Sequence, residues 1–375
     1  MNAIVISGTG LFTPTESISN EELVASFNAY VANYNKKHVK EIQAGTVDPL
    51  AESSVAFIEK ASGIQSRYVM EKSGILDPEF MCPRIPERHN EEQSIQCEMS
   101  VKAAKGAMEM ANKSANEIDA VFVACSNFQR PYPAIAIEVQ NALGIEGFAV
   151  DMNMACSTAT FGIQTAVDSI FRNNARSILM VNPEICSGHL NFRDRDSHFI
   201  FGDVCTAVII EKGELCETPT AFEIVSTKLK TSFSSNIRNN RGFMNRTHPK
   251  TMNSPDKLFK QQGRKVFKEV VPMAAKLIVE HLAENNVDPS HLKRLWLHQA
   301  NLSMNLLISK KVLGRDAKPE EAPVILNEYA NTSSAGSIIS FHKHNGDFVE
   351  GDLGIICSFG AGYSIGNVIV KKINL

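Results

Sequence analysis

The 375-residue chain lacks the long apolar segment that marks a membrane protein. No apolar run approaches the roughly 20 residues that a membrane-spanning helix needs, and residues 1–7 do not resemble a signal peptide. Basic and acidic side chains nearly balance, at 38 and 41, and the net charge of −3 does not indicate a broad nucleic-acid surface. We therefore expect a globular cytoplasmic protein with no membrane and no nucleic-acid partner.

The eight cysteines include no C-x-x-C pair, and their density is too low for a disulfide scaffold. We expect them to be reduced thiols, which raises the question of whether one of them is reactive. No clustered His, Cys and Asp pattern predicts a metal site. The glycine-rich stretch at 358–366 lacks the spacing of a dinucleotide fingerprint or of a P-loop, so the sequence predicts neither a metal nor a bound cofactor.

Short, continuously apolar runs are separated by segments with helical periodicity. Continuous apolar character predicts strands that are buried on both faces, as in an α/β sheet covered by helices. The predicted strands include residues 120–125, 177–181, 206–210, 294–297 and 354–357, and the predicted helices lie near 101–111, 267–281 and 301–313.

The segments hint at two related halves. Residues 118–127 and 292–301 each read as a polar lead, a buried strand and a small polar stop, although chance similarity between two strands would also explain this. We place the division near residue 215, giving halves of 1–215 and 216–375. Residues 20–55 and 69–94 read as insertions, either as surface decoration or as a cap or subunit contact.

Cys156 lies where an apolar run ends and helical periodicity begins. A helix N-terminus favours a thiolate and leaves backbone N–H groups free, so this position suits a nucleophile. Most cysteines, however, are simply small buried residues.

Two further polar residues follow apolar segments. His298 stands at the end of the predicted strand 294–297, at the sheet edge where α/β proteins bind ligands, although it could equally be a core histidine. Asn331 precedes a run of small and hydroxyl residues and could simply be an N-cap. The glycine-rich turn after Phe359 could be a hairpin, or it could offer backbone N–H groups to an anion.

Together, Ala-Cys-Ser at 155–157, His-Gln-Ala-Asn at 298–301, Ala-Asn-Thr-Ser at 330–333 and Phe-Gly-Ala-Gly at 359–362 resemble the thiolase superfamily. More narrowly, the chain is similar to 3-oxoacyl-[acyl-carrier-protein] synthase III over nearly its whole length, apart from the two insertions. The resemblance implies an α/β fold of five αβαβα layers, with two similar halves related by a pseudo-twofold axis. It also implies a homodimer and a decarboxylative Claisen condensation of an acyl-CoA primer with malonyl-acyl carrier protein.

The resemblance implies roles for individual residues. Cys156 would be the nucleophile, with His298 and Asn331 completing a Cys-His-Asn set, and the N–H groups of Cys156 and Ala361 would form the oxyanion hole. Phe201 and Phe359 lie in motifs that border the substrate. Tyr132 stands where the family usually has a phenylalanine that reaches into the partner subunit.

Several positions depart from the family pattern. Thr158 replaces a glycine and should reshape the acyl pocket; Phe57 and Ala61 stand where the family clamps CoA with Trp and Arg; and Ser303 replaces a frequent arginine. The insertions resemble those of longer members that take medium-chain primers. Primer identity and the mode of CoA binding are therefore open.

Other functions share these residue types. The alternatives are another acyl-CoA condensing enzyme of the superfamily, a Cys-His-Asn thioester hydrolase, and a non-catalytic partner subunit, although the last class usually lacks the cysteine. Residues 228–268 are locally basic and are either a docking surface for an acidic carrier protein or a solvated face.

Overall fold

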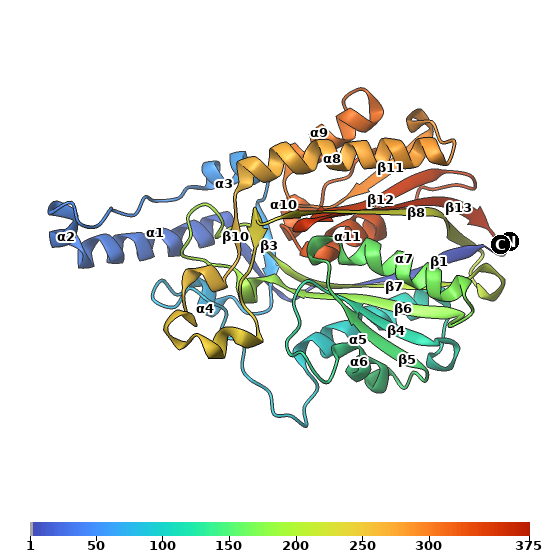
Figure 1. The fold of residues 1–375 in the computed structure, drawn as a ribbon, viewed down its shortest axis with the longest axis horizontal. Helices are drawn as coiled ribbons and strands as arrows, with labels where there is room; N and C mark the ends of the chain where they lie inside the picture. Colours follow the sequence, from blue (N-terminus) through green and yellow to red (C-terminus); the bar gives the residue numbers. More distant parts are fainter. Residues whose placement is uncertain (1–2) are drawn as a thin grey trace.

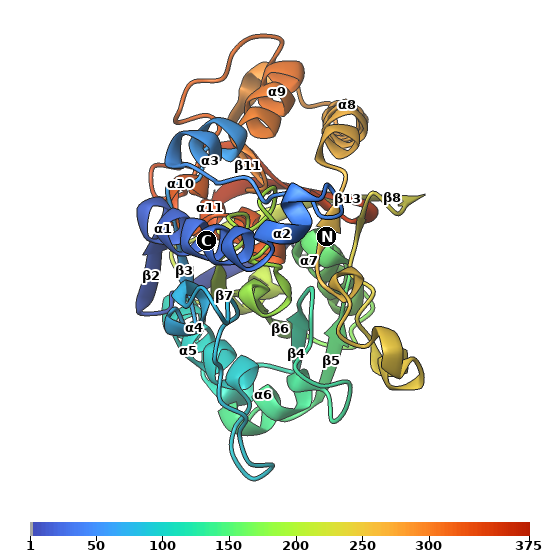
Figure 2. The same cartoon turned by 90° about the vertical axis from the view of Figure 1, so that its left-hand side faces the viewer.

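The computed structural model describes residues 3–375 as five stacked layers (Figure 1). Two helices form the middle layer, two sets of strands enclose it, and further helices cover the outside. Figure 2 shows the same stacking from the side, with α9 and α8 at one end and α6 at the other. The α/β, thiolase-like architecture expected from the motifs is confirmed.

The strands form one nine-stranded sheet that bends around the middle layer, in the order β11-β12-β13-β8-β1-β7-β6-β4-β5. The strands of the first half are β1 (Ile4–Phe12), β4 (Ala120–Ala124), β5 (Phe148–Met152), β6 (Ser177–Ile185) and β7 (Asp203–Lys212). Those of the second half are β8 (Thr220–Ser234), β11 (Leu292–Leu297), β12 (Leu353–Gly360) and β13 (Gly362–Asn374).

The strand pairings repeat between the halves. The parallel pair β4–β6 corresponds to the parallel pair β11–β12, and the antiparallel ladders β6–β7 and β7–β1 correspond to β12–β13 and β13–β8. The halves meet where β1 pairs with β8 over two residues. The two halves therefore share one strand topology, as the predicted pseudo-twofold relation requires. The domain boundary at residue 215 stays a prediction.

Apolar contacts hold the layers together. The middle helices, α7 (Thr158–Phe171) and α11 (Gly336–Lys343), pack between strands of both halves, with Phe122 and Trp296 on opposite sides of the same core. The outer helices are α5 (Ile95–Ala111) and α6 (Ile135–Leu143) on one face, and α8 (Gly263–Glu284) and α9 (Leu302–Leu313) on the other. Strands buried on both faces explain why their sequences are continuously apolar.

The first insertion forms an arm that projects from the body (Figure 1), and Figure 2 faces its tip. It consists of α1 (Asn20–Lys37), α2 (Val39–Gln43) and an extended return segment, residues 46–54, that leads to α3 (Val55–Ser62). Asn28 clamps the backbone of Ser53 with two hydrogen bonds, of 2.9 and 3.1 Å, and Asn35 clamps Leu50 in the same way, at 2.9 and 3.0 Å. The return segment is therefore fastened along the helix at two points.

The remaining short elements lie around the base of the arm and the edges of the body. They are β2 (Glu16–Ser19), β3 (Ser66–Val69), α4 (Ser73–Leu76), β9 (Ile237–Arg238), β10 (Lys260–Gln261) and α10 (Leu326–Tyr329). Among the helices of residues 3–375, none has the length and apolar character required to cross a membrane.

Candidate active site

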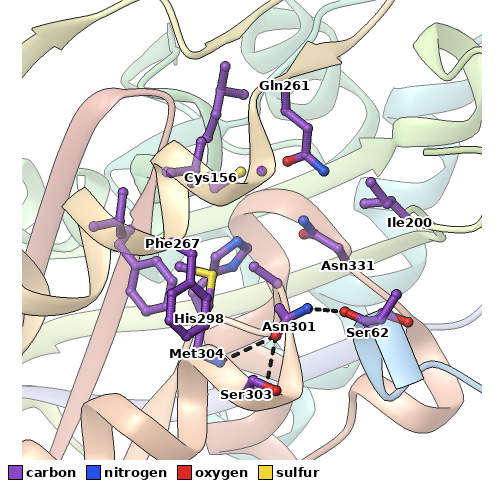
Figure 3. A pocket seen from close by; sticks show the side chains of 18 of the residues that line it. Ser62, Cys156, Ile200, Gln261, Phe267, His298, Asn301, Ser303, Met304 and Asn331 are labelled. Carbon is purple, nitrogen blue, oxygen red and sulfur yellow. Dashed lines mark hydrogen bonds between the residues drawn. The ribbon is translucent and has the colours of Figure 1, made fainter. Parts of the chain in front are cut away.

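A cavity of about 480 Å³ brings together the three side chains singled out from the sequence. Cys156, His298 and Asn331 all line it, and Figure 3 shows their side chains directed into the same space. The remaining walls are largely apolar and include Ile200, Phe201, Phe259, Phe267 and Phe359. A buried space with a few convergent polar groups is the usual form of a catalytic pocket.

Cys156 lies in a short 3-10 turn, Ala155–Ser157, between β5 and α7. The turn is strained, because Ala155 adopts a left-handed φ of 48°, a conformation that costs free energy for a residue with a side chain. Two hydrogen bonds tie the turn to β13: Ser157 Oγ donates to the Ser364 carbonyl at 2.9 Å, and Ser364 Oγ donates to the Met154 carbonyl at 3.2 Å. The second half of the molecule thus holds the nucleophile in place.

Glycine is required opposite the sulfur. A Cβ added to Gly360 would lie 2.6 Å from Cys156 Cβ and 3.1 Å from Sγ, closer than real contacts allow. The backbone N–H groups of Cys156 and of Ala361, the residue after this glycine, both lie near enough to the sulfur to lower its pKa. Two amides directed at one point are the arrangement that stabilises a developing oxyanion.

The resting sulfur is a thiol, which corrects the expectation that the helix N-terminus makes it anionic. The pKa of Cys156 is raised to about 11, mainly by burial and also by the nearby Glu184 carboxylate, whereas a hydrogen bond from Ser333 Oγ at 3.5 Å and the two amides lower it. Removal of water from around the sulfur outweighs the donors that surround it. A base must therefore take the proton when substrate is bound.

His298 follows β11 and is fixed by its backbone, whose N–H donates to the Cys357 carbonyl at 2.8 Å. Its ring meets Phe359 edge-on, with centroids 5.2 Å apart, and only 1% of the residue is exposed. Burial lowers the pKa of His298 to about 3, so the imidazole is neutral at any ordinary pH. Its Nδ1 atom is buried and makes no hydrogen bond to the described residues.

Asn331 is held by two backbone hydrogen bonds to the segment of residues 200–202. Its N–H donates to the Ile200 carbonyl at 2.9 Å, and its own carbonyl accepts from Gly202 N–H at 3.1 Å. Its side-chain Oδ1 accepts from Ser333 N–H at 2.9 Å, so the amide is oriented with Nδ2 as the donor on the cavity side. The hydrogen bond from Ser333 N–H to Oδ1 is of the N-cap type, but Asn331 also lines the cavity.

The other predicted substrate-binding residues fall into two groups. Phe201, Phe359 and Ser303 line the cavity with the three polar residues. Thr158 is fully buried and bonds within its own turn, accepting from Met154 N–H at 2.8 Å and donating to the Ala155 carbonyl at 2.6 Å, and it is not part of the cavity wall. Its proposed effect on the acyl pocket would have to be indirect.

Phe57 and Tyr132 also lie outside the cavity wall. The Phe57 ring contacts Phe199, which does line the cavity, and the guanidinium of Arg195 lies 4.2 Å over the Phe57 ring. Tyr132 lies on a surface loop and is 82% exposed, so its ring is not part of the core of this chain.

Sequence reasoning missed several residues around the nucleophile. Ser333, which donates to the sulfur, stood within a quoted motif but was given no role there. Glu184 carries no local motif. The position of Glu184 at the end of the apolar run that forms β6 was the signal that could have found it, because polar residues at that sheet edge often serve a site.

Comparison with known proteins agrees with this geometry. Residues 150–232, which contain Cys156, match the family 3-Oxoacyl-[acyl-carrier-protein (ACP)] synthase III, and residues 282–372, which contain His298 and Asn331, match its C-terminal part. A beta-ketodecanoyl-[acyl-carrier-protein] synthase of Pseudomonas aeruginosa is 62% identical over 347 residues, covering 92% of this chain and 99% of that protein.

Solved structures share the fold at low identity. The 3-oxoacyl-[acyl-carrier-protein] synthase III of Aquifex aeolicus superposes with a TM-score of 0.76 at 22% identity, covering 98% of this chain and 99% of that one. Xanthomonas campestris OleA, crystallised with lauric acid and lauroyl-CoA, superposes with a TM-score of 0.73 at 16% identity over 98% and 99% of the two chains. These two likenesses concern the fold alone.

Proposed function

Because the chain belongs to the 3-oxoacyl-[acyl-carrier-protein] synthase III family, we propose that it condenses an acyl-CoA primer with malonyl-acyl carrier protein. The product is a 3-oxoacyl-acyl carrier protein lengthened by two carbons. The observation that carries this proposal is the single cavity in which Cys156, His298 and Asn331 meet. The reaction needs no metal or redox cofactor, since a thiol, an imidazole, an amide and two backbone N–H groups supply its chemistry.

The first half-reaction acylates the enzyme. Cys156 attacks the thioester carbonyl of acyl-CoA while the neutral imidazole of His298 relays the thiol proton to the departing CoA sulfur, and CoA leaves as a thiol. The N–H groups of Cys156 and Ala361 stabilise the tetrahedral oxyanion, and one such donor is worth about 3–4 kcal/mol. The result is an acyl-cysteine and free CoA.

The second half-reaction forms the carbon–carbon bond. His298 and Asn331 donate hydrogen bonds to the thioester oxygen of malonyl-acyl carrier protein and stabilise the enolate that forms as CO₂ departs. The enolate carbon attacks the acyl-cysteine carbonyl, and the tetrahedral intermediate collapses with release of the Cys156 sulfur. A neutral His298 suits this step, because it stabilises negative charge as a hydrogen-bond donor and is too weak an acid to quench the carbanion.

We propose an eight-carbon primer. The Pseudomonas aeruginosa relative is named for a ten-carbon product, and each condensation adds two carbons. Five apolar side chains near Cys156 offer a wall for such a chain: Phe199, Ile200, Phe201, Ile237 and Phe259.

Intact-protein mass spectrometry after exposure to acyl-CoAs of two to sixteen carbons tests both the nucleophile and the primer. We expect an octanoyl adduct to dominate and Cys156→Ser to remove it. Addition of malonyl-acyl carrier protein should then discharge the adduct with release of CO₂. Preference for acetyl-CoA would contradict the primer length, and discharge by water alone would indicate a thioester hydrolase.

We propose that the carrier protein docks at the N-terminal part of α8. Arg264 and Lys268 line the cavity mouth, Lys265 lies between them in the sequence, and all three are exposed. Within residues 3–375 none of them is in an ion pair, whereas Lys228, Arg238 and Lys260 of the same basic segment each pair with a carboxylate. Unpaired cations at the entrance favour an acidic partner.

Charge reversal tests this docking surface. Lys268→Glu should raise KM for malonyl-acyl carrier protein several-fold and change acylation by acyl-CoA much less. Lys250→Glu is the matched control, because Lys250 is an exposed cation of the same segment that does not line the cavity. Equal loss in both half-reactions would contradict docking at Lys268.

We also propose that the chain is a homodimer joined along β5. This strand is the edge of the sheet, and its Phe148 and Val150 side chains are 37% and 40% exposed. Tyr132 and Ile137 are also exposed apolar residues of this half. An uncovered edge strand with exposed apolar residues is a template for pairing with a second copy.

A further inference from the structure

Glu184 is a buried carboxylate whose role the reaction scheme does not state. It is the second-last residue of β6, and only 1% of the residue is exposed. Among the described residues no cation pairs with it. Burial raises the pKa of Glu184, while hydrogen bonds from two serines oppose that effect. A buried acid without a cation is costly and is normally retained for a reason.

The carboxylate joins three segments of the chain. Its Oε1 atom accepts from Ser126 N–H at 3.0 Å and from Ser334 N–H at 3.1 Å, and its Oε2 atom accepts from Ser126 Oγ at 2.5 Å. The Ser334 hydroxyl also hydrogen-bonds the carboxylate and lies 3.1 Å from the Ala124 carbonyl. Glu184 therefore connects the ends of β4 and β6 to the loop of residues 330–334.

This loop needs an anchor, because its backbone is strained. Ala330 and Ser333 both adopt left-handed φ values, 54° and 50°, which are uncommon for residues with side chains and persist only where the surroundings impose them. Asn331 is held to Ile200 and Gly202 on one side. Glu184 holds the other side, at Ser334.

The loop carries two groups that face the reaction. Asn331 lines the cavity, and Ser333 Oγ donates to the Cys156 sulfur at 3.5 Å. Ser334 follows directly in the chain, so movement at Ser334 would displace both groups. A shift of about 1 Å at a reacting group can cost roughly 100-fold in rate.

We propose that Glu184 is a positioning residue that acts through Ser334 to hold Asn331 and Ser333 against Cys156. This inference deepens the proposed function and rests on it. The Glu184 carboxylate also raises the pKa of Cys156 through its charge, so removing the charge has a signature that loss of packing alone would not produce. The other titratable groups around these two residues are Cys125, Cys186, Cys205, Asp203 and the neutral His298.

The test compares Glu184→Gln, which removes the charge, with Glu184→Asp, which keeps the charge but shortens the reach. The pH dependence of Cys156 alkylation by iodoacetamide is followed by mass spectrometry of the peptide that contains residue 156. For Glu184→Gln we expect the midpoint to fall by about one pH unit, and for Glu184→Asp we expect it to stay. We expect condensation to fall roughly 10- to 100-fold in both variants, and acylation by octanoyl-CoA by less than about threefold.

Asp203→Asn is the matched control for loss of a buried acid. Asp203 is fully buried and accepts from Ser187 N–H and Oγ and from Met70 N–H, without touching the 330–334 loop. Asp203→Asn should therefore leave the pH midpoint of Cys156 alkylation at its wild-type value. If both Glu184 variants fold poorly, Ser334→Ala removes only one hydroxyl and should still slow condensation more than Ser126→Ala does.

The proposal is overturned if Glu184→Gln and Asp203→Asn give the same alkylation midpoint. It is also overturned if Ser334→Ala condenses at the wild-type rate. Failure of the proposed function would look different, because the wild-type protein itself would then form no 3-oxoacyl product, while the alkylation comparison would remain readable.

Discussion

His298 makes the stability of the folded chain depend on pH in a defined direction. The pKa of this imidazole is about 3 in the folded protein and about 6.5 in the unfolded chain, so the unfolded chain binds the extra proton first. Stability is therefore fully present above pH 6.5 and declines as the pH falls towards 3. The contribution of this one residue at pH 5, relative to pH 8, is about 2 kcal/mol.

Urea unfolding of the wild type and of His298→Gln at pH 8 and pH 5 measures this contribution. The wild type should lose about 2 kcal/mol more than the variant between the two pH values. The buried His189 and His198, whose pKa values are also lowered by burial, are present in both proteins and cancel in the comparison. Parallel losses would show that His298 is more solvated than its burial implies.

At Gly360 the absence of a side chain is what leaves room for the nucleophile. Gly360→Ala should displace Cys156, lower acylation by octanoyl-CoA at least about 100-fold, and destabilise the fold by about 1–3 kcal/mol. Gly346→Ala, which has no heavy atom within 4 Å of the added methyl, should change neither quantity. Normal acylation of Gly360→Ala would mean that the β12–β13 turn can move away from the sulfur.

Individual residues differ in how far sequence could place them. The motifs around Cys156, His298 and Asn331, taken together, predicted a shared site. The ionisation of Cys156 was predicted wrongly, because the helix N-terminus was visible in the sequence and the depth of burial was not. Glu184 and Ser334 meet across 150 positions, a pairing that no local pattern encodes.

At the scale of elements, the arm depends on two asparagines seven positions apart on one face of α1. Each one donates to a backbone carbonyl of the return segment and accepts from the N–H of the same residue. Asn35→Ala should speed hydrogen exchange of the Leu50 amide, and Asn28→Ala that of Ser53, each losing about 1 kcal/mol of local protection per hydrogen bond.

The two arm variants are controls for each other, since each should affect its own clamp and leave the other protected. Exchange measured by mass spectrometry on short overlapping peptides separates residue 50 from residue 53. Simultaneous loss of both protections in either variant would show that the arm opens as one unit. The acylation rate should be unchanged in both variants, because neither residue lines the cavity.

Sequence predicted the buried elements better than the exposed ones. β4, β6, β7, β11 and β12 were found because burial on both faces makes a strand continuously apolar. α9 was found because Asn301 caps its start and Gly314, with a φ of 71°, ends it. β8 was missed because its residues are mostly half-exposed or exposed, which leaves no apolar run to detect. The segment 20–55 was recognised as an insertion, but its extension as an arm depends on the clamps.

At the scale of the whole molecule, the exposed edge at β5 sets the expected assembly. Val150→Lys puts a charge on that edge and should convert a dimer into a monomer, as measured by size-exclusion chromatography with light scattering. Val279→Lys is the matched control, since Val279 on α8 is 39% exposed, close to the 40% of Val150, but lies away from the edge. A dimer that persists in Val150→Lys would place the contact elsewhere.

The hydrogen bonds between the turn that carries Cys156 and β13 have a consequence during translation of the chain. Met154, Ser157 and the sulfur itself are held by Ala361 and Ser364, which leave the ribosome after every other part of the site. During translation the cysteine therefore emerges about 200 residues before its oxyanion amide, a stretch that takes roughly 10–40 s at ordinary elongation rates. Until the final strand docks, the cysteine therefore lacks the Ala361 amide and the β13 contacts that surround it in the folded protein.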